Sequence, residues 1–222
     1  MSIPNDYLAK ARLLANLQAE GLHDKRVIEA LEKVPREWFV PDELRSRAYE
    51  NIALPIGDDQ TISQPTVVAH MVQAAAIRPS DHVLEIGTGS GYCAAVLAQL
   101  ALDVVTVEIR PDLAMSASRR LSELGCHNVH VIVADGSLGW GALAPYEVII
   151  TTAATPGLPP VLLEQLSPNG GRLVAPVGTL RRQQLVYARR SGDGIESHAL
   201  GSVRFVPLVG AAGFHLPDSR KN

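Results

Sequence analysis

Alternating glycines follow an acidic residue in the segment Val83–Gly91, and this pattern suits a site that binds a ligand through the backbone. The apolar residues before Glu85 predict a buried strand over 82–86, and the apolar run 92–101 predicts a helix. Glycine lets the main chain approach a ligand closely, and a helix N-terminus offers free N–H groups. The candidate binding residues of this corner are Glu85, Gly87, Thr88, Gly89, Ser90 and Gly91.

The glycine spacing narrows the class of ligand. A dinucleotide fingerprint, G-x-G-x-x-G/A, that starts at Gly87 needs Gly or Ala at position 92, where this chain has Tyr92. The chain also lacks the G-x-x-x-x-G-K-[ST] pattern that binds nucleoside triphosphates. The spacing therefore disfavours a nicotinamide oxidoreductase and a triphosphate-binding protein.

Acidic residues also end the next two predicted strands, over 103–107 and 129–133. Glu108 lies 21 positions after Gly87, a spacing that suits an acid accepting hydrogen bonds from ribose hydroxyls. Asp135 could accept from an adenine amino group, and Gly136 would give the ring clearance. Alone, each acid is compatible with a solvated loop or a turn. Because ligands gather at the carboxyl ends of parallel strands, the three acids together predict nucleoside binding.

A polar loop over 54–65 precedes the glycine corner and contains Ser63. Pro65 is expected to open a helix over 65–77, which places Ser63 close to the helix N-terminus. Ser63 could simply cap this helix. Because the loop leads into the helix before the first sheet strand, it could also lie over the ligand cleft.

Strands and helices alternate along most of the chain, which predicts an α/β fold with a mostly parallel, doubly wound sheet. The late strands lack long helices between them, so we expect an antiparallel edge. We expect a single domain over 1–216, with an N-terminal helical extension and the start of the substrate loop in 1–60, a core in 61–216, and a disordered tail over 217–222. The remaining expected helices are 5–20, 24–33, 111–124 and 159–166, and the remaining strands are 147–151, 171–175, 183–189 and 202–206.

The composition excludes several other classes of protein. The 222 residues are 46% hydrophobic and 19% charged, with a net charge of −3 and no basic stripe, so nucleic acid is not an expected partner. No apolar run is long enough to cross a membrane. Two cysteines cannot form a disulfide framework, so we expect a cytoplasmic protein, and we expect a monomer.

Several motifs, in order along the chain from about residue 8 to 214, resemble the protein L-isoaspartate O-methyltransferase family. Acid-x-G-x-G-x-G resembles the first motif of methyltransferases that use S-adenosylmethionine. The matching segments are Val34–Pro41, Ala48–Tyr49, Thr61–Pro65, Glu85–Tyr92, Ala134–Gly136, Ala144–Tyr146 and Arg204–Leu208. The chain departs from the pattern at Asp59, where many bacterial members have Gly, at Thr66, where they have an aromatic residue or His, and at Glu147, where Asp is usual. The first two departures leave the fine specificity open.

The resemblance implies a Rossmann-like methyltransferase fold and S-adenosyl-L-methionine as cofactor. It implies methylation of the free α-carboxyl group of L-isoaspartyl residues in damaged proteins and peptides, with succinimide formation from the ester beginning repair. Ser63 matches the family's active-site serine, and the substrate-binding residues would be Thr61, Ile62, Ser63, Val206 and Pro207.

The chemistry implied needs no general base, because an α-carboxyl group with a pKa near ~3.5 is already ionised at neutral pH. Two alternatives stay open: a related carboxyl methyltransferase acting on a dedicated peptide or small carboxylic acid, and a nucleoside-binding protein without catalysis.

Cys126, His127 and His130 lie close together in sequence, but no second ligand cluster accompanies them, so we expect no metal.

Overall fold

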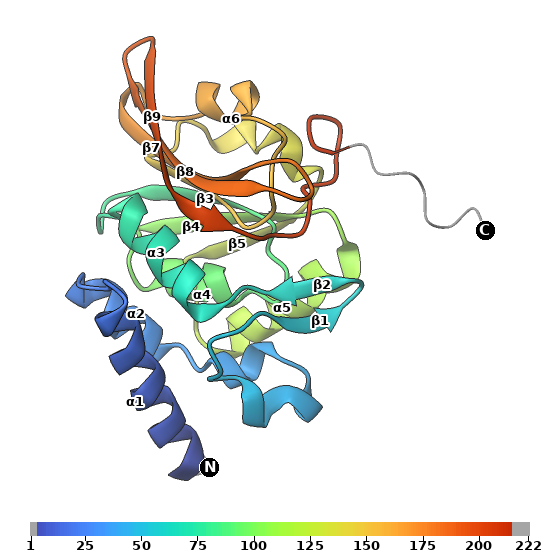
Figure 1. The fold of residues 1–222 in the computed structure, drawn as a ribbon. Helices are drawn as coiled ribbons and strands as arrows, with labels where there is room; N and C mark the ends of the chain where they lie inside the picture. The colour runs from blue at the N-terminus through green and yellow to red at the C-terminus, as the bar shows by residue number, and fades with distance from the viewer. Residues whose placement is uncertain (1–3, 215–222) are drawn as a thin grey trace.

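A seven-stranded sheet forms the centre of the computed structural model, which describes residues 4–214, with side chains from Tyr7 onward (Figure 1). The strands, in chain order, are β3 (His82–Ile86), β4 (Asp103–Glu108), β5 (Val129–Val133), β6 (Val148–Thr151), β7 (Asn169–Gly178), β8 (Gln183–Ser191) and β9 (Gly194–Val203). A separate two-stranded sheet contains β1 (Leu54–Gly57) and β2 (Gln60–Ile62). The α-helices are α1 (Pro4–Ala19), α2 (Lys25–Lys33), α3 (Pro65–Ala75), α4 (Tyr92–Ala98), α5 (Pro111–Glu123) and α6 (Pro160–Glu164). Short 3₁₀ helices are η1 (Arg36–Phe39), η2 (Asp42–Arg47), η3 (Gly136–Leu138) and η4 (Gly141–Leu143).

The strand order confirms the predicted doubly wound sheet with an antiparallel edge. The order is β5-β4-β3-β6-β7-β8-β9, with β5 to β7 parallel and with β8 and β9 antiparallel to their neighbours. The chain leaves β3 toward β4 and β5, then returns to the other side of β3 as β6. The carboxyl ends of β3 and β6 therefore form the switch point at which open α/β sheets bind ligands.

Alternate residues of the central strands pack on opposite faces of the sheet. Val83 of β3 and Val104 of β4 belong to one hydrophobic cluster with residues of α3 and α4, whereas Leu84 and Val105 belong to a second cluster with Leu162 of α6. The residues that these strands contribute to the two clusters are buried. Because both faces of the sheet are covered, the strand sequences are almost continuously apolar.

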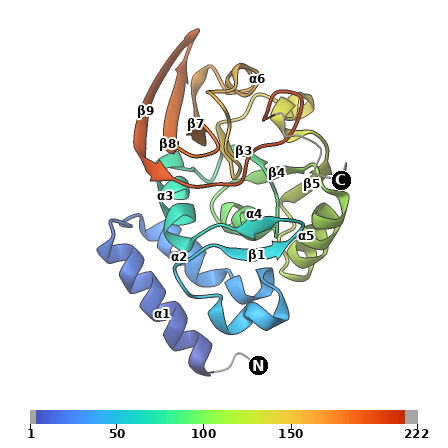
Figure 2. The ribbon, with the colours of Figure 1, turned by 45° about the vertical axis from the view of Figure 1, so that its right-hand side comes forward.

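The N-terminal helices pack against the sheet and share its first hydrophobic cluster. Leu17 of α1 and Val27 of α2 are buried in this cluster together with Met71 of α3 and Leu97 of α4. Asp24 caps α2 by accepting a hydrogen bond from the N–H of Arg26 at 2.9 Å. Figure 2 shows α1 and α2 beside α3, below the sheet.

Two sequence predictions of strand positions were wrong. The segment predicted as a polar loop contains the antiparallel hairpin β1–β2, whose strands are too short to show a clear alternation. The last strand was predicted over 202–206, but β9 covers Gly194–Val203 and the chain leaves the sheet after it. Because almost all of β9 is exposed, it has no apolar face that could reveal it in the sequence.

Within residues 4–214, no helix is long and apolar enough to cross a membrane. The helices predicted over 92–101 and 159–166 are shorter in the structure, ending at Ala98 and Glu164. The predicted disordered tail over 217–222 lies outside the described residues.

Candidate active site

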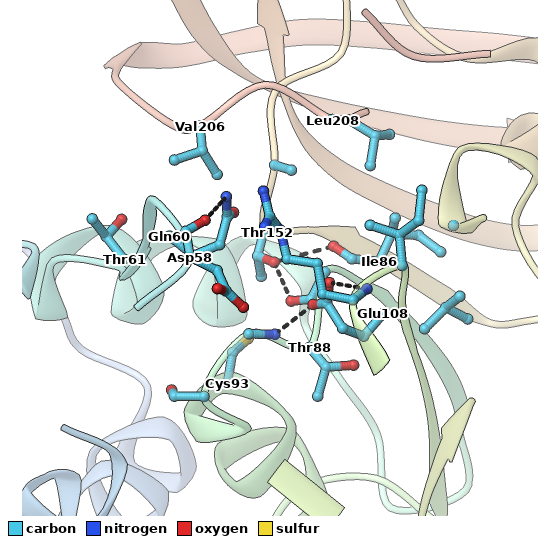
Figure 3. A pocket seen from close by; sticks show the side chains of 18 of the residues that line it. Asp58, Gln60, Thr61, Ile86, Thr88, Cys93, Glu108, Thr152, Val206 and Leu208 are labelled. Carbon is cyan, nitrogen blue, oxygen red and sulfur yellow. Dashed lines mark hydrogen bonds between the residues drawn. The ribbon is translucent and has the colours of Figure 1, made fainter. Parts of the chain in front are cut away.

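A cavity of about 530 Å³ opens at the carboxyl ends of the central parallel strands. Figure 3 shows Val206 and Leu208 on one side of it, with Thr88, Cys93 and Glu108 on the opposite side. The predicted site residues that line it are Thr61, Ile62, Ser63, Gly87, Thr88, Gly89, Ser90, Glu108, Gly136, Val206 and Pro207. The structure therefore brings most of the predicted site together, although these residues come from segments far apart in the sequence.

The glycine corner packs too tightly for larger residues at two of its positions. A Cβ at Gly87 would lie 2.5 Å from Thr152 Oγ1, which donates a hydrogen bond to the Gly87 carbonyl. Gly91 has a φ of +92°, and a Cβ there would lie 3.2 Å from the Ala117 Cβ in α5. Gly91 does not line the cavity, so its part is to let α4 begin close to α5.

Glu108 ends β4 with its carboxylate held by two backbone groups. The N–H of Gly89 donates to Oε2 at 2.9 Å, and the N–H of Arg110 donates to Oε1 at 3.1 Å. The side chain lines the cavity. Each carboxylate oxygen has a further lone pair, so Glu108 can still accept from a ligand hydroxyl.

Glu85 lies behind the cavity and does not line it. Its side chain is completely buried, and its Oε2 accepts a hydrogen bond from Thr106 Oγ1 at 2.5 Å. Thr106 in turn contacts Thr88 Oγ1 at 2.7 Å, so Glu85 reaches the glycine corner through two hydroxyls. Oε1 has no hydrogen-bond partner among the described residues. Burial raises the pKa of Glu85 to about 7, although the hydrogen bond from Thr106 acts in the opposite direction.

Asp135 is also placed behind the cavity wall. Its carboxylate accepts hydrogen bonds from the N–H and hydroxyl of Ser137 and from the N–H of Ala211. Asp135 does not line the cavity, whereas Gly136 does. A Cβ at Gly136 would lie 2.8 Å from the Ile86 Cγ2, so glycine is needed where this segment meets the end of β3.

Ser63 lies where the first cavity meets a second one of about 350 Å³. Its hydroxyl has no hydrogen-bond partner within residues 4–214, while its carbonyl accepts from Arg36 Nη2 at 2.8 Å. Gln64, not Ser63, is the N-cap residue of α3 and makes no side-chain capping bond. The alternative of Ser63 as a helix cap was therefore wrong. The residues that line both cavities are Thr61, Ser63, Thr152 and Val206.

Hydrogen bonds with Ala154 and with Gln183 hold the segment after β9. The Val206 carbonyl accepts from the N–H of Ala154, and the N–H of Leu208 donates to the Ala154 carbonyl, both at 2.8 Å. Phe205 is held by Gln183, whose side-chain amide donates to its carbonyl and accepts from its N–H. Among the described residues, no group bonds to the Val206 N–H or to the Pro207 carbonyl. The Pro207 carbonyl, which lies on the side away from Ala154 in the bridge that pairs these two residues, can therefore accept a hydrogen bond from an extended chain.

Sequence reasoning missed several residues that line the cavity. Arg110 and Asp112 follow directly after Glu108, and Thr152 follows β6. Examining the end of every parallel strand, rather than the first three, would have found Thr152. Asp58 lines the cavity from the tip of the β1–β2 hairpin, where it has a φ of +51°.

Thr66, one of the positions at which the chain differs from the family pattern, makes hydrogen bonds within the protein. The Thr66 hydroxyl donates to Glu20 at 2.8 Å and lies at the same distance from Asn51 Oδ1, and Thr66 lines neither cavity.

No group of three or more His, Cys, Asp or Glu residues that could hold a metal ion occurs in the described part of the chain.

A mostly parallel seven-stranded sheet, with a glycine corner and a cavity at its switch point, defines the class of Rossmann-like methyltransferases. A solved protein-L-isoaspartate O-methyltransferase structure matches with a TM-score of 0.82 at 30% identity, covering 92% of this chain and 67% of its own. A Plasmodium falciparum structure containing S-adenosyl-L-homocysteine shares the fold with a TM-score of 0.78 at 23% identity, covering 90% of this chain and 98% of its own.

Sequence comparison is more specific. The protein-L-isoaspartate O-methyltransferase of Protochlamydia amoebophila is 54% identical over 205 residues, covering 91% of this chain and 97% of the relative. That of Methanoculleus marisnigri is 49% identical over 198 residues, covering 89% and 90%. The family model of protein-L-isoaspartate(D-aspartate) O-methyltransferase matches residues 8–213. The chain belongs to this family.

Proposed function

We propose that this chain transfers a methyl group from S-adenosyl-L-methionine to the free α-carboxylate of L-isoaspartyl residues in damaged proteins and peptides. Repair then begins as the ester closes to a succinimide. The observation that carries this assignment is the junction of two cavities at Ser63, one suited to a nucleoside and one open to a peptide.

The first cavity fits the cofactor. The backbone at Gly87–Ser90 lines it, and the fixed Glu108 carboxylate can accept hydrogen bonds from ribose hydroxyls. Asp58, Glu108 and Asp112 outnumber Arg110 among the charged lining residues, which suits a ligand that carries a sulfonium cation. Gly136 leaves room for the adenine ring. Glu85, Gly91 and Asp135 do not line this cavity and would support the binding only indirectly, through the segments that contain lining residues.

The rate of methyl transfer then depends on how the substrate carboxylate is aligned with the methyl group, and no proton has to be transferred. S-Adenosylmethionine, when bound, supplies an electrophilic methyl group, and the substrate carboxylate is already ionised at neutral pH. The Ser63 hydroxyl, which has no protein partner, would donate to one carboxylate oxygen and leave the other free to react. Alignment of this kind can contribute on the order of 7–11 kcal/mol to catalysis. A neutral hydroxyl also reduces the reactivity of the carboxylate less than a cation would.

The second cavity and the segment after β9 would hold the substrate peptide. The Pro207 carbonyl can accept a hydrogen bond from an extended backbone, and Thr61 and Ile62 line the first cavity beside Ser63. In an isoaspartyl residue the free carboxylate is attached directly to the α-carbon of the main chain. In a normal aspartyl residue the chain continues through the α-carboxyl carbon, so the free carboxylate lies one methylene further from the main chain and would not reach Ser63 in the same register. A small carboxylic acid has no chain that could bind the segment after β9, which favours a peptide substrate.

We further propose that the chain acts as a monomer in the cytoplasm. Both cysteines, Cys93 and Cys126, are free and buried, as expected for a protein of a reducing compartment. Light scattering of the purified chain tests the monomer.

The function is tested by labelled methyl transfer to paired peptides that differ only in an isoaspartyl or aspartyl residue. We expect methyl incorporation into the isoaspartyl peptide alone. Equal labelling of both peptides, or of neither while the cofactor binds, would contradict the assignment. A small-carboxylate panel in the same assay tests the alternative substrate class.

A further inference from the structure

Arg36 is a buried cation that contacts the loop containing Ser63. It begins η1 and is only 1% exposed. Its Nη2 donates to the Ser63 carbonyl and its Nε donates to the Ala48 carbonyl, both at 2.8 Å. No carboxylate forms an ion pair with it in the described part of the chain. Because guanidinium stays protonated in proteins, these carbonyls must stabilise the buried charge.

The same guanidinium also contacts the ring of Tyr92, the residue that directly follows the glycine corner. Its central carbon lies 4.9 Å from the centroid of the Tyr92 ring, and Phe39 packs edge-on against that ring at 5.6 Å. Tyr92 is the first residue of α4 and follows Gly91 directly. One side chain therefore connects the backbone of Ser63 to the start of α4, the helix that follows the glycine corner.

We propose that Arg36 is a positioning residue for methyl transfer. By fixing the Ser63 backbone relative to Tyr92, it sets the direction of the Ser63 hydroxyl at the junction of the two cavities. Arg36 lines neither cavity, so it acts through Ser63 and not on a ligand. This inference rests on the proposed function, in which Ser63 binds the substrate carboxylate.

Lysine cannot replace this arrangement. A planar guanidinium donates in several directions and stacks on a ring at the same time, whereas an ammonium is a compact point charge. Arg36→Lys therefore keeps the charge and removes the simultaneous contact with Ala48, Ser63 and Tyr92.

Arg172 offers a matched control. It is also buried, at 8% exposure, and donates to the Ala75 and Ala76 carbonyls at 2.8 and 3.2 Å while forming an ion pair with Asp81. It lines neither cavity and holds the C-terminal end of α3. Arg172→Lys should lower the Tm but leave the kcat of the folded protein unchanged.

The test compares kcat on an isoaspartyl peptide, the Kd of S-adenosyl-L-homocysteine, and the Tm for the wild type and both variants. We expect Arg36→Lys to lower kcat at least tenfold, measured where the protein is folded, while the nucleoside Kd stays within threefold. In a Ser63→Ala background, Arg36→Lys should lower kcat by less than threefold further.

Three results would overturn the positioning role: an unchanged kcat in folded Arg36→Lys, an equal loss of kcat in Arg172→Lys, or multiplicative effects of Arg36→Lys and Ser63→Ala. If Arg36→Lys does not fold, Tyr92→Leu removes the stacked ring and keeps the carbonyl contacts. The positioning role then requires the same selective loss of kcat, and an unchanged kcat contradicts it. A wild type that binds the nucleoside but methylates no isoaspartyl peptide overturns the proposed function and this inference together.

Discussion

The carboxylate of Glu108 accepts a hydrogen bond from the N–H of Gly89 at 2.9 Å, which joins the end of β4 to the glycine corner that follows β3. Its other oxygen accepts from the N–H of Arg110. The Glu108 side chain is thus held in place between the ends of β3 and β4, and it is oriented before any ligand binds. Such preorganisation reduces the entropy lost on binding.

Glu108→Gln should weaken cofactor binding. Both protein partners are N–H donors, so an amide must place its NH₂ group opposite one of them. Losing a hydrogen bond to a charged group costs about 1.5–3 kcal/mol, and we expect at least a tenfold rise in the Kd of S-adenosyl-L-homocysteine by calorimetry. Glu123→Gln, on the exposed side of α5, is the control. An unchanged Kd would show that Glu108 does not hold the nucleoside.

Ser63→Ala should lower kcat on an isoaspartyl peptide about 10- to 100-fold, because the substrate carboxylate loses the donor that orients it. The Kd of S-adenosyl-L-homocysteine should stay close to that of the wild type. Ser122→Ala is a matched control, since Ser122 is exposed on α5 and lines neither cavity. If Ser63→Ala retains full activity, the positioning role of this hydroxyl is wrong.

Gln183→Leu should raise the peptide KM more than it changes kcat. The Gln183 amide makes both hydrogen bonds to Phe205, at 2.7 and 3.1 Å, and thereby holds the segment that would bind the substrate. The neighbouring Gln184→Leu removes an exposed amide that bonds to Ser202 and should change KM little. Steady-state kinetics with both substrates varied measures this, and equal KM values for the two variants would contradict it.

Glu85→Gln should change the pH dependence of stability. Burial raises the pKa of Glu85 from its ordinary value of 4.5 to about 7, so the folded state binds more protons than the unfolded state between these pH values. The free energy of unfolding of the wild type therefore falls as the pH rises through this window and levels off above it. Glutamine does not ionise, so the free energy of unfolding of Glu85→Gln does not fall over this pH range. Relative to the wild type, the variant should therefore gain stability between pH 5 and pH 8, by at most roughly 3 kcal/mol.

Urea unfolding at several pH values measures this difference. Glu164→Gln, at an exposed position in α6, controls for the removal of a carboxylate. A stability difference between Glu85→Gln and the wild type that is independent of pH would mean that Glu85 is not a buried acid with a raised pKa.

The sequence allowed the positions of the glycine corner after β3 and of Glu108 at the end of β4 to be predicted, because they depend on local geometry and on the common direction of parallel strands. Glu85 and Asp135 were also predicted to contact the ligand, but neither lines the cavity. The β1–β2 hairpin was missed since its turn contains Asp58 and Asp59, both at positive φ, where two-residue turns usually have glycine. Arg36 and Gln183 were not predicted as contributors to the site. Both act through backbone groups distant in sequence, and only the tertiary structure brings these groups together.

Equilibrium binding of an isoaspartyl peptide to the chain saturated with S-adenosyl-L-homocysteine tests most directly whether the two cavities meet at Ser63. We predict a ternary complex, in which the nucleoside leaves the peptide Kd unchanged or lower, and much weaker binding of the matching aspartyl peptide. Competition between the nucleoside and the peptide for one site would contradict the account.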